Sequence, residues 1–211
     1  MGPNVMRKRL GPLWEDVKRH LGWKPKYELF NPASVTPEDG AWLAGLIDGE
    51  GCFRIQKPSP NGGDGLSRSY SPTFCISFRT DDKPMLEQLC DIIKTDYHFH
   101  IDNHVSDNEK GGKSNPAFKF YVRDITTLAY HLIPILERYP LRSKKKYELP
   151  YFKLAVNLLM TKRLDNRSYL GYTDEERQTL DNIFHLLQEF KKYNSNHEEI
   201  IARYNLPNLL T

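Results

Sequence analysis

Residues 43–51 read Leu-Ala-Gly-Leu-Ile-Asp-Gly-Glu-Gly, and the rest of the chain is organised around them. Strong helix-start signals precede this stretch, because Thr36 suits an N-cap and Pro37 suits the first helical position. A helix is therefore predicted to begin at residue 37 or 38. Asp48 and Glu50 bring negative charge to its C-terminal end, where the helix dipole disfavours each charge by about 0.3–1 kcal/mol. Negative charge that opposes the helix dipole in this way indicates a functional site.

Small residues recur along the same predicted helix. Ala41, Gly45 and Gly49 are spaced four residues apart and would form one flat ridge, against which a second helix can pack closely. A glycine inside a helix costs about 0.8–1 kcal/mol relative to alanine, so two of them indicate a packing role. On periodicity alone, the alternative is a buried core helix that ends at a glycine cap.

The nine residues 43–51 resemble the signature of the LAGLIDADG homing endonucleases, differing only in Gly49 for the second alanine and Glu50 for the second aspartate. The resemblance implies a helix that packs against a second copy of itself. It further implies that Glu50 and Gly49 bind a divalent metal, and that Asp48 satisfies backbone groups at the helix ends. One motif per chain then implies a homodimer, with Ala41, Gly45 and Asp48 at its interface.

Composition sets broader limits. The formal net charge of +3 is too small to indicate nucleic-acid binding by itself. Three cysteines, Cys52, Cys75 and Cys90, include no C-x-x-C pair, so neither a disulfide framework nor a zinc site is indicated. No apolar run suits a membrane span or a signal peptide. We expect an intracellular protein, in the cytoplasm or nucleoid of a prokaryote or inside an organelle.

Four stretches alternate apolar and polar residues and are predicted to be half-buried strands, at residues 52–56, 73–79, 97–102 and 118–123. Helices are predicted between and after the strand pairs, from about Pro84 to Lys94 and from about Ile125 to Arg138. The order is helix, two strands, helix, two strands, helix. This is an α+β fold, and it matches the αββαββα core with an antiparallel DNA-binding sheet that the resemblance implies.

The chain is expected to have three parts, with the endonuclease core at residues 36–165. A helical extension precedes it at residues 1–35. A second helical extension follows at residues 166–211, in which Thr173 and Glu176 form a capping box.

The polar face of the sheet carries side chains of the kinds that contact base edges and phosphates. A polar face on an antiparallel sheet is ordinarily just solvated, and the nonapeptide makes DNA binding the favoured interpretation. The polar face and the nearby loops carry the expected DNA-binding residues, which are Arg54, Gln56, Lys57, Arg68, Thr73, Ser77, Arg79, His98, His100, Lys113, Lys119, Tyr121, Arg123 and Lys145. A metal site at His98, His100 and His104 is disfavoured, because no cysteine or second carboxylate joins them at ligand spacing.

Residues 142–146 are rich in cations and resemble the family's stretch that leads to a lysine near the scissile phosphates. By that match Lys144 is the expected catalytic lysine and Lys145 the second choice, stabilising charge on phosphate or helping to deprotonate water. Arg79 at the end of the second strand is expected to orient water or phosphate.

The resemblance implies a site-specific endonuclease that recognises a long, near-palindromic duplex and makes a metal-dependent double-strand break with 3′ overhangs, as in intron homing. The expected metal is Mg²⁺ or Mn²⁺, whereas Ca²⁺ is expected to support binding without cleavage. Two other functions on the same fold stay open: a splicing maturase that acts on intron RNA, and a DNA-binding regulator that does not cleave. Loss of the acid would indicate a regulator, but Glu50 is present.

Overall fold

The computed structural model describes residues 31–58, 69–79, 82–94, 98–102, 117–162, 171–192, 196–204, 206–207 and 209. The expected N-terminal extension is almost entirely outside the described residues, as are Arg68 and Lys113. The expected boundary near residue 165 also falls outside them.

Helix α3, Pro37–Glu50, follows a short 3₁₀ turn, η2, at Pro32–Ser34. Thr36 caps α3, since its side chain accepts a hydrogen bond from the Asp39 backbone N–H, as the sequence predicts. Gly51 ends the helix in an extended conformation, at φ −66° and ψ 153°. A Cβ at this position would lie 2.7 Å from both Ile47 Cγ2 and Ile47 O. Close contact, and not a left-handed cap, therefore favours glycine here.

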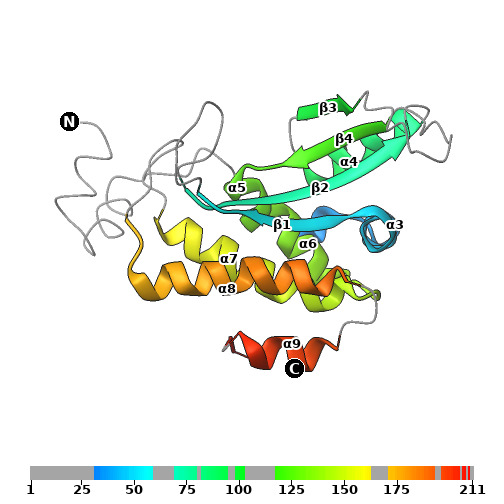
Figure 1. The fold of residues 1–211 in the computed structure, drawn as a ribbon. Helices are drawn as coiled ribbons and strands as arrows, with labels where there is room; N and C mark the ends of the chain where they lie inside the picture. The colour runs from blue at the N-terminus through cyan, green and yellow to red at the C-terminus, as the bar shows by residue number, and fades with distance from the viewer. Residues whose placement is uncertain are drawn as a thin grey trace, which may run out of the picture.

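Four antiparallel strands form one sheet in the order β1-β2-β4-β3, as Figure 1 shows. They are β1 Cys52–Gln56, β2 Ser71–Arg79, β3 His98–Asp102 and β4 Ala117–Val122. All four predicted strands are confirmed to within two residues. The predicted alternation is clearest in β1, where Phe53 and Ile55 are buried while Arg54 and Gln56 are exposed.

The helices follow the expected order and complete the αββαββα core. Those described after α3 are α4 Lys83–Ile93, α5 Ile125–Thr127, the π-helical η4 Leu128–Leu132, α6 Ile133–Arg138, α7 Lys145–Lys162, α8 Asp174–Phe190 and α9 His197–Arg203. The single helix predicted from 125 to 138 is thus a continuous run with a π-helical middle. The capping box that begins α8 is confirmed, because Thr173 and Glu176 exchange both hydrogen bonds.

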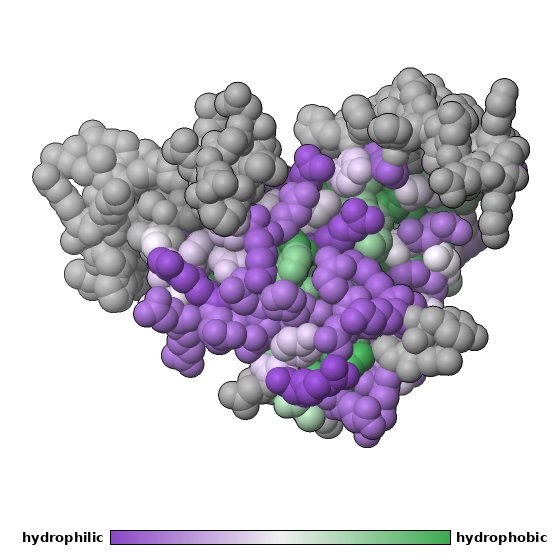
Figure 2. All heavy atoms as spheres, viewed as in Figure 1, coloured by the Kyte–Doolittle hydropathy of each residue, from purple (hydrophilic) through white to green (hydrophobic). Residues whose placement is uncertain are grey.

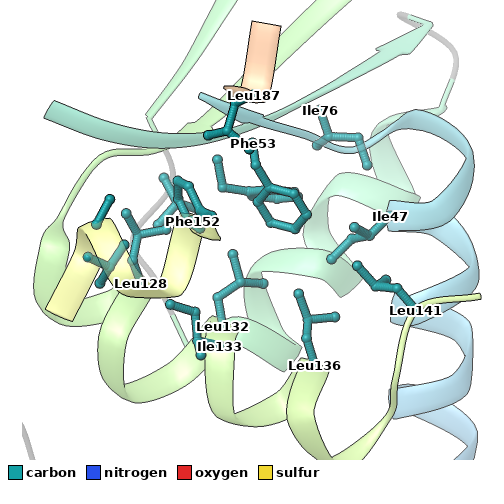
Figure 3. Packing of buried hydrophobic residues seen from close by; sticks show 14 of the residues in the cluster. Ile47, Phe53, Ile76, Leu128, Leu132, Ile133, Leu136, Leu141, Phe152 and Leu187 are labelled. Atoms are coloured by element: carbon teal, nitrogen blue, oxygen red, sulfur yellow. The ribbon is translucent and has the colours of Figure 1, made fainter. Parts of the chain in front are cut away.

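The hydrophobic core lies between one face of the sheet and the helices (Figure 3). Phe53 of β1 packs against Phe152 of α7 with ring centroids 5.0 Å apart. Leu187 of α8 belongs to the same buried cluster, so the C-terminal helices share the core with the sheet. No helix in the described part of the chain is long and apolar enough to cross a membrane.

Candidate functional site

Asp48 joins the end of α3 to the start of α7. Its carboxylate accepts hydrogen bonds from Arg142 N at 2.7 Å, Ser143 N at 3.0 Å and Ser143 Oγ at 2.6 Å. Burial opposes the charge, but these hydrogen bonds and the Lys145 ammonium outweigh it and lower the pKa of Asp48. The expected structural role is confirmed. Both carboxylate oxygens thus serve this junction within the chain, and the expected place of Asp48 at a dimer interface stays a prediction.

Lys145 reaches the C-terminal carbonyl oxygens of α3. Its Nζ lies 2.6 Å from Asp48 O and 3.2 Å from Gly49 O, which places a cation at the negative end of the helix dipole. Lys144 Nζ instead lies 3.4 Å from Lys191 O, beyond the end of α8. Of the two lysines, Lys145 is therefore the one beside the end of α3, which favours the second choice over Lys144, and the catalytic role of either lysine stays a prediction. Adjacent residues at a helix start point about 100° apart, so only one of them can face α3.

Glu50 is exposed as the last residue of α3. With the carbonyl of Gly49 it offers oxygen ligands only, which suit Mg²⁺, Mn²⁺ or Ca²⁺. The contact between the Gly49 carbonyl and the Lys145 ammonium shows that this oxygen is already directed at a cation. No group of three or more His, Cys, Asp or Glu residues suited to a metal occurs among the described residues.

The small-residue ridge of α3 is open. Ala41, Gly45 and Gly49 are exposed, and a Cβ added at Gly45 or Gly49 would meet nothing within 4 Å. The opposite side of the helix, including Leu43 and Ile47, is fully buried. The alternative of a core helix that ends at a glycine cap holds for this buried side and for Gly51, and the ridge on the other side is open.

The polar side chains of the sheet share one face. Arg54 lies opposite Thr73, and Ser77 lies opposite Lys119. The same face holds the exposed Arg54, Gln56, Ser77 and Arg79 and the half-buried Lys119 and Tyr121, with Arg123 exposed just after β4. In β3, His98 and His100 are in register with Tyr121 and Lys119, although their side chains lie outside the described residues. Figure 2 shows a largely hydrophilic surface over the described residues of the side it views.

Two residues expected to bind DNA are engaged inside the chain. Thr73 is only 3% exposed, because it occupies an inner strand beside the longer Arg54. Lys57 Nζ forms an ion pair with Asp181 at 3.0 Å and lies 3.2 Å from His185 Nε2, both on α8. The expectation for Thr73 is therefore wrong for the chain as folded, whereas for Lys57 the ion pair with α8 competes with DNA. The packing of α8 along β1 brings Asp181 and His185 to Lys57, which local sequence patterns do not reveal.

Arg79 is the last residue of β2 and is exposed on the polar face. Cys52 is the second residue after α3, and its register partner on β2 is Cys75. Arg79 lies four residues beyond Cys75 along β2. At about 3.3 Å per residue, this is roughly 13 Å along the strand. Its catalytic role stays a prediction, whereas its place on the polar face is clear.

Two titratable groups near the end of α3 escaped the sequence patterns. The pKa of Cys52 is lowered to about 5, mainly by a hydrogen bond from the Cys75 thiol. Arg54 lowers this pKa further, and burial opposes both effects. The side chain of Glu148 on α7 is 2% exposed, and burial raises its pKa to about 7 despite the nearby Lys191. The sequence offered no signal for either, because both depend on contacts between distant segments.

Comparison with known families identifies the fold and its central helix. The model of the LAGLIDADG endonuclease family matches residues 43–156, which is more than half of the 211-residue chain. The chain belongs to the LAGLIDADG endonuclease family. The matched segment begins at the nonapeptide and continues through the sheet into α7.

Solved LAGLIDADG structures share this fold. The I-LtrWI homing endonuclease, bound to its target DNA, has 19% sequence identity and a TM-score of 0.53, and the alignment covers 80% of this chain and 49% of that chain. The I-SmaMI meganuclease, bound to uncleavable DNA, has 17% identity and a TM-score of 0.53, with 81% and 50% covered. This chain therefore spans about half the length of these proteins. No curated protein sequence matches it.

Proposed function

We propose that the chain is one subunit of a homodimeric DNA endonuclease that cuts both strands of a long, near-palindromic duplex. The observation that carries this proposal is that one helix, α3, presents both the exposed acid Glu50 and an open ridge at Gly45. Two copies of the chain would also match the length of I-LtrWI or I-SmaMI, since one copy spans about half of either. A two-fold dimer would read a target with matching two-fold symmetry.

The polar face of the sheet would contact the duplex. Antiparallel strands fit the major groove, where Arg54 and Gln56 suit base edges and Lys119 suits phosphate. These side chains extend from β1 and β4, the two strands that flank β2, on one face of the sheet, so they could follow several successive base pairs. Lys57 and Thr73 take no part, because Lys57 is held by α8 and Thr73 is buried.

The metal would be Mg²⁺ or Mn²⁺, bound by Glu50 and the Gly49 carbonyl of each subunit. When bound, it supplies Lewis-acid stabilisation of phosphate oxygens and lowers the pKa of a bound water. Glu50 would hold the ion, because two such carboxylates at the base of a helix pair repel each other unless cations lie between them. Lys145 places its ammonium beside the same helix end, where it stabilises negative charge that develops on phosphate.

The proposed product is a double-strand break with 3′ overhangs, and the proposed biological role is intron homing. The family resemblance supports both. A maturase would show itself by tight binding to intron RNA, and a regulator by target binding without cleavage in any divalent metal.

The test uses Glu50→Gln in the full chain. A target is first selected from a randomised palindromic duplex library by binding in Ca²⁺, and cleavage is then measured in Mg²⁺. We expect the variant to bind the target in Ca²⁺ with the parent's affinity and to leave it uncut in Mg²⁺, because the metal loses a charged ligand while the sheet is unchanged. The matched control is Glu38→Gln, an exposed acid at the other end of α3, which should cut like the parent. Full double-strand cleavage by the Glu50→Gln homodimer would remove Glu50 from the mechanism.

A further inference from the structure

Cys52 and Cys75 lie directly opposite each other on β1 and β2. Opposite residues of an antiparallel pair have Cα atoms about 4.5–5.5 Å apart. This spacing lies within the range of about 4.4–6.8 Å that a disulfide bond spans. Both are free thiols in the structure. The spacing of the two strands at this pair therefore suits a disulfide bond.

The two thiols differ in how they can be reached. Cys52 is half-buried, whereas Cys75 is 7% exposed. A reagent in solution therefore meets Cys52 first. Cys75 then reacts from inside the protein, by attacking the disulfide bond that Cys52 has formed with the reagent. Arg54 Nε donates to Cys52 Sγ at 3.2 Å, and the positive charge of Lys191 also acts on this thiol. Two cations beside the entry thiol favour an anionic reagent.

We propose that Cys52 and Cys75 form a redox-active dithiol, which oxidised glutathione or a similar small anionic disulfide converts into a cross-strand disulfide. Cys52 Sγ attacks one sulfur of oxidised glutathione, and one reduced glutathione leaves. Cys75 Sγ then attacks Cys52 Sγ and displaces the second glutathione. The two protein thiols together lose two electrons and two protons, and these electrons and protons leave on the two reduced glutathione molecules.

The location of the dithiol gives a second expectation, which rests on the proposed function. Cys52 is two residues beyond Glu50, and its sulfur touches Arg54 on the polar face of the sheet. A duplex bound on this face would cover the entry thiol. Bound target DNA should therefore slow formation of the disulfide.

The dithiol is tested without DNA on the reduced, full-length native chain. The protein is incubated with oxidised glutathione, blocked with iodoacetamide, digested and mapped by mass spectrometry. We expect one intramolecular link, Cys52 to Cys75, that dithiothreitol reverses. Cys90, which is 5% exposed and lies on α4, should stay a thiol.

Three variants provide controls. Cys75→Ser should stop at a stable glutathione adduct on Cys52, because the resolving thiol is missing. Cys52→Ser should react at least tenfold more slowly at Cys75, and Cys90→Ser should form the same disulfide as the parent. Links that join different chains, links that include Cys90, or a persistent adduct on the parent Cys52 would each overturn the proposal.

The DNA arm repeats the oxidation of the parent with saturating target in Ca²⁺. At least threefold slower disulfide formation is expected. If the duplex binds and the rate does not change, the dithiol does not lie under the DNA. If no duplex binds, the proposed function fails while the mapped disulfide stands.

Discussion

Lys145 and Lys144 are adjacent in sequence, but their ammonium groups lie against different helices. Lys145 contacts the end of α3, and Lys144 contacts the carbonyl of Lys191. We expect Lys145→Ala to slow cleavage of the selected target at least tenfold, because the lost charge acts in the transition state. Binding in Ca²⁺ should change less than threefold. Single-turnover cleavage assays measure the first effect, and Lys144→Ala is the matched control. Slower cleavage by Lys144→Ala than by Lys145→Ala would restore Lys144 as the catalytic lysine.

Glu148 is a buried acid whose pKa of about 7 lies above its value in an unfolded chain. Below about pH 4.3 it is protonated in both states and has no effect. As the pH rises toward 7, the unfolded chain releases this proton before the folded chain does, so the free energy of unfolding falls. Above pH 7 both states have released the proton, and the free energy of unfolding falls no further. Glu148→Gln removes this dependence. Between pH 5 and pH 8, the free energy of unfolding of the variant should therefore rise relative to that of the parent by about 1–3 kcal/mol.

Urea unfolding of the parent and of Glu148→Gln at the two pH values measures this gain. Glu175→Gln, at an exposed site in the first turn of α8, should show no comparable gain. An unchanged difference between Glu148→Gln and the parent at pH 5 and pH 8 would mean that the buried carboxylate does not titrate in this range.

At the scale of elements, the turn from α3 into β1 depends on Gly51. A Cβ there would lie 2.7 Å from the carbonyl oxygen and Cγ2 of Ile47, which the helix and core hold in place. Gly51→Ala should therefore lower the free energy of unfolding by about 1–3 kcal/mol. Chemical denaturation measures it. Gly171→Ala, where an added Cβ meets nothing within 4 Å, should stay within about 0.5 kcal/mol of the parent. Equal effects at the two sites would contradict the close contact at Gly51.

At the scale of the whole molecule, the open ridge of α3 predicts a two-fold dimer. Gly45→Leu should fold, because an added Cβ meets nothing within 4 Å, and yet it should be monomeric because leucine separates the paired helices. Sedimentation velocity distinguishes the two states, with the parent expected as a homodimer. The control Gln88→Leu, exposed on α4, should remain dimeric. A dimeric Gly45→Leu variant, or a parent that binds its target as a monomer, would contradict the proposed interface.

The sequence by itself determined the elements whose signals are local. Thr36 and Pro37 set the start of α3, and the two-residue alternation around Phe53 predicted a strand with one buried face. The nonapeptide predicted the family and the place of the acid Glu50 at the helix end. These features follow from backbone hydrogen bonding, capping and side-chain periodicity, which depend on neighbours a few residues away.

Only the tertiary structure decided which side chains at the site are available. The contact from α7 to α3 placed Lys145, and not Lys144, beside the end of α3, and the packing of α8 along β1 engaged Lys57. The register of β1 on β2 paired Cys52 with Cys75, which lie far apart in the sequence. Each outcome depends on how residues distant in the chain pack together, and a shift of one residue in register would reverse which face a side chain occupies. No pattern within a short window contains that information.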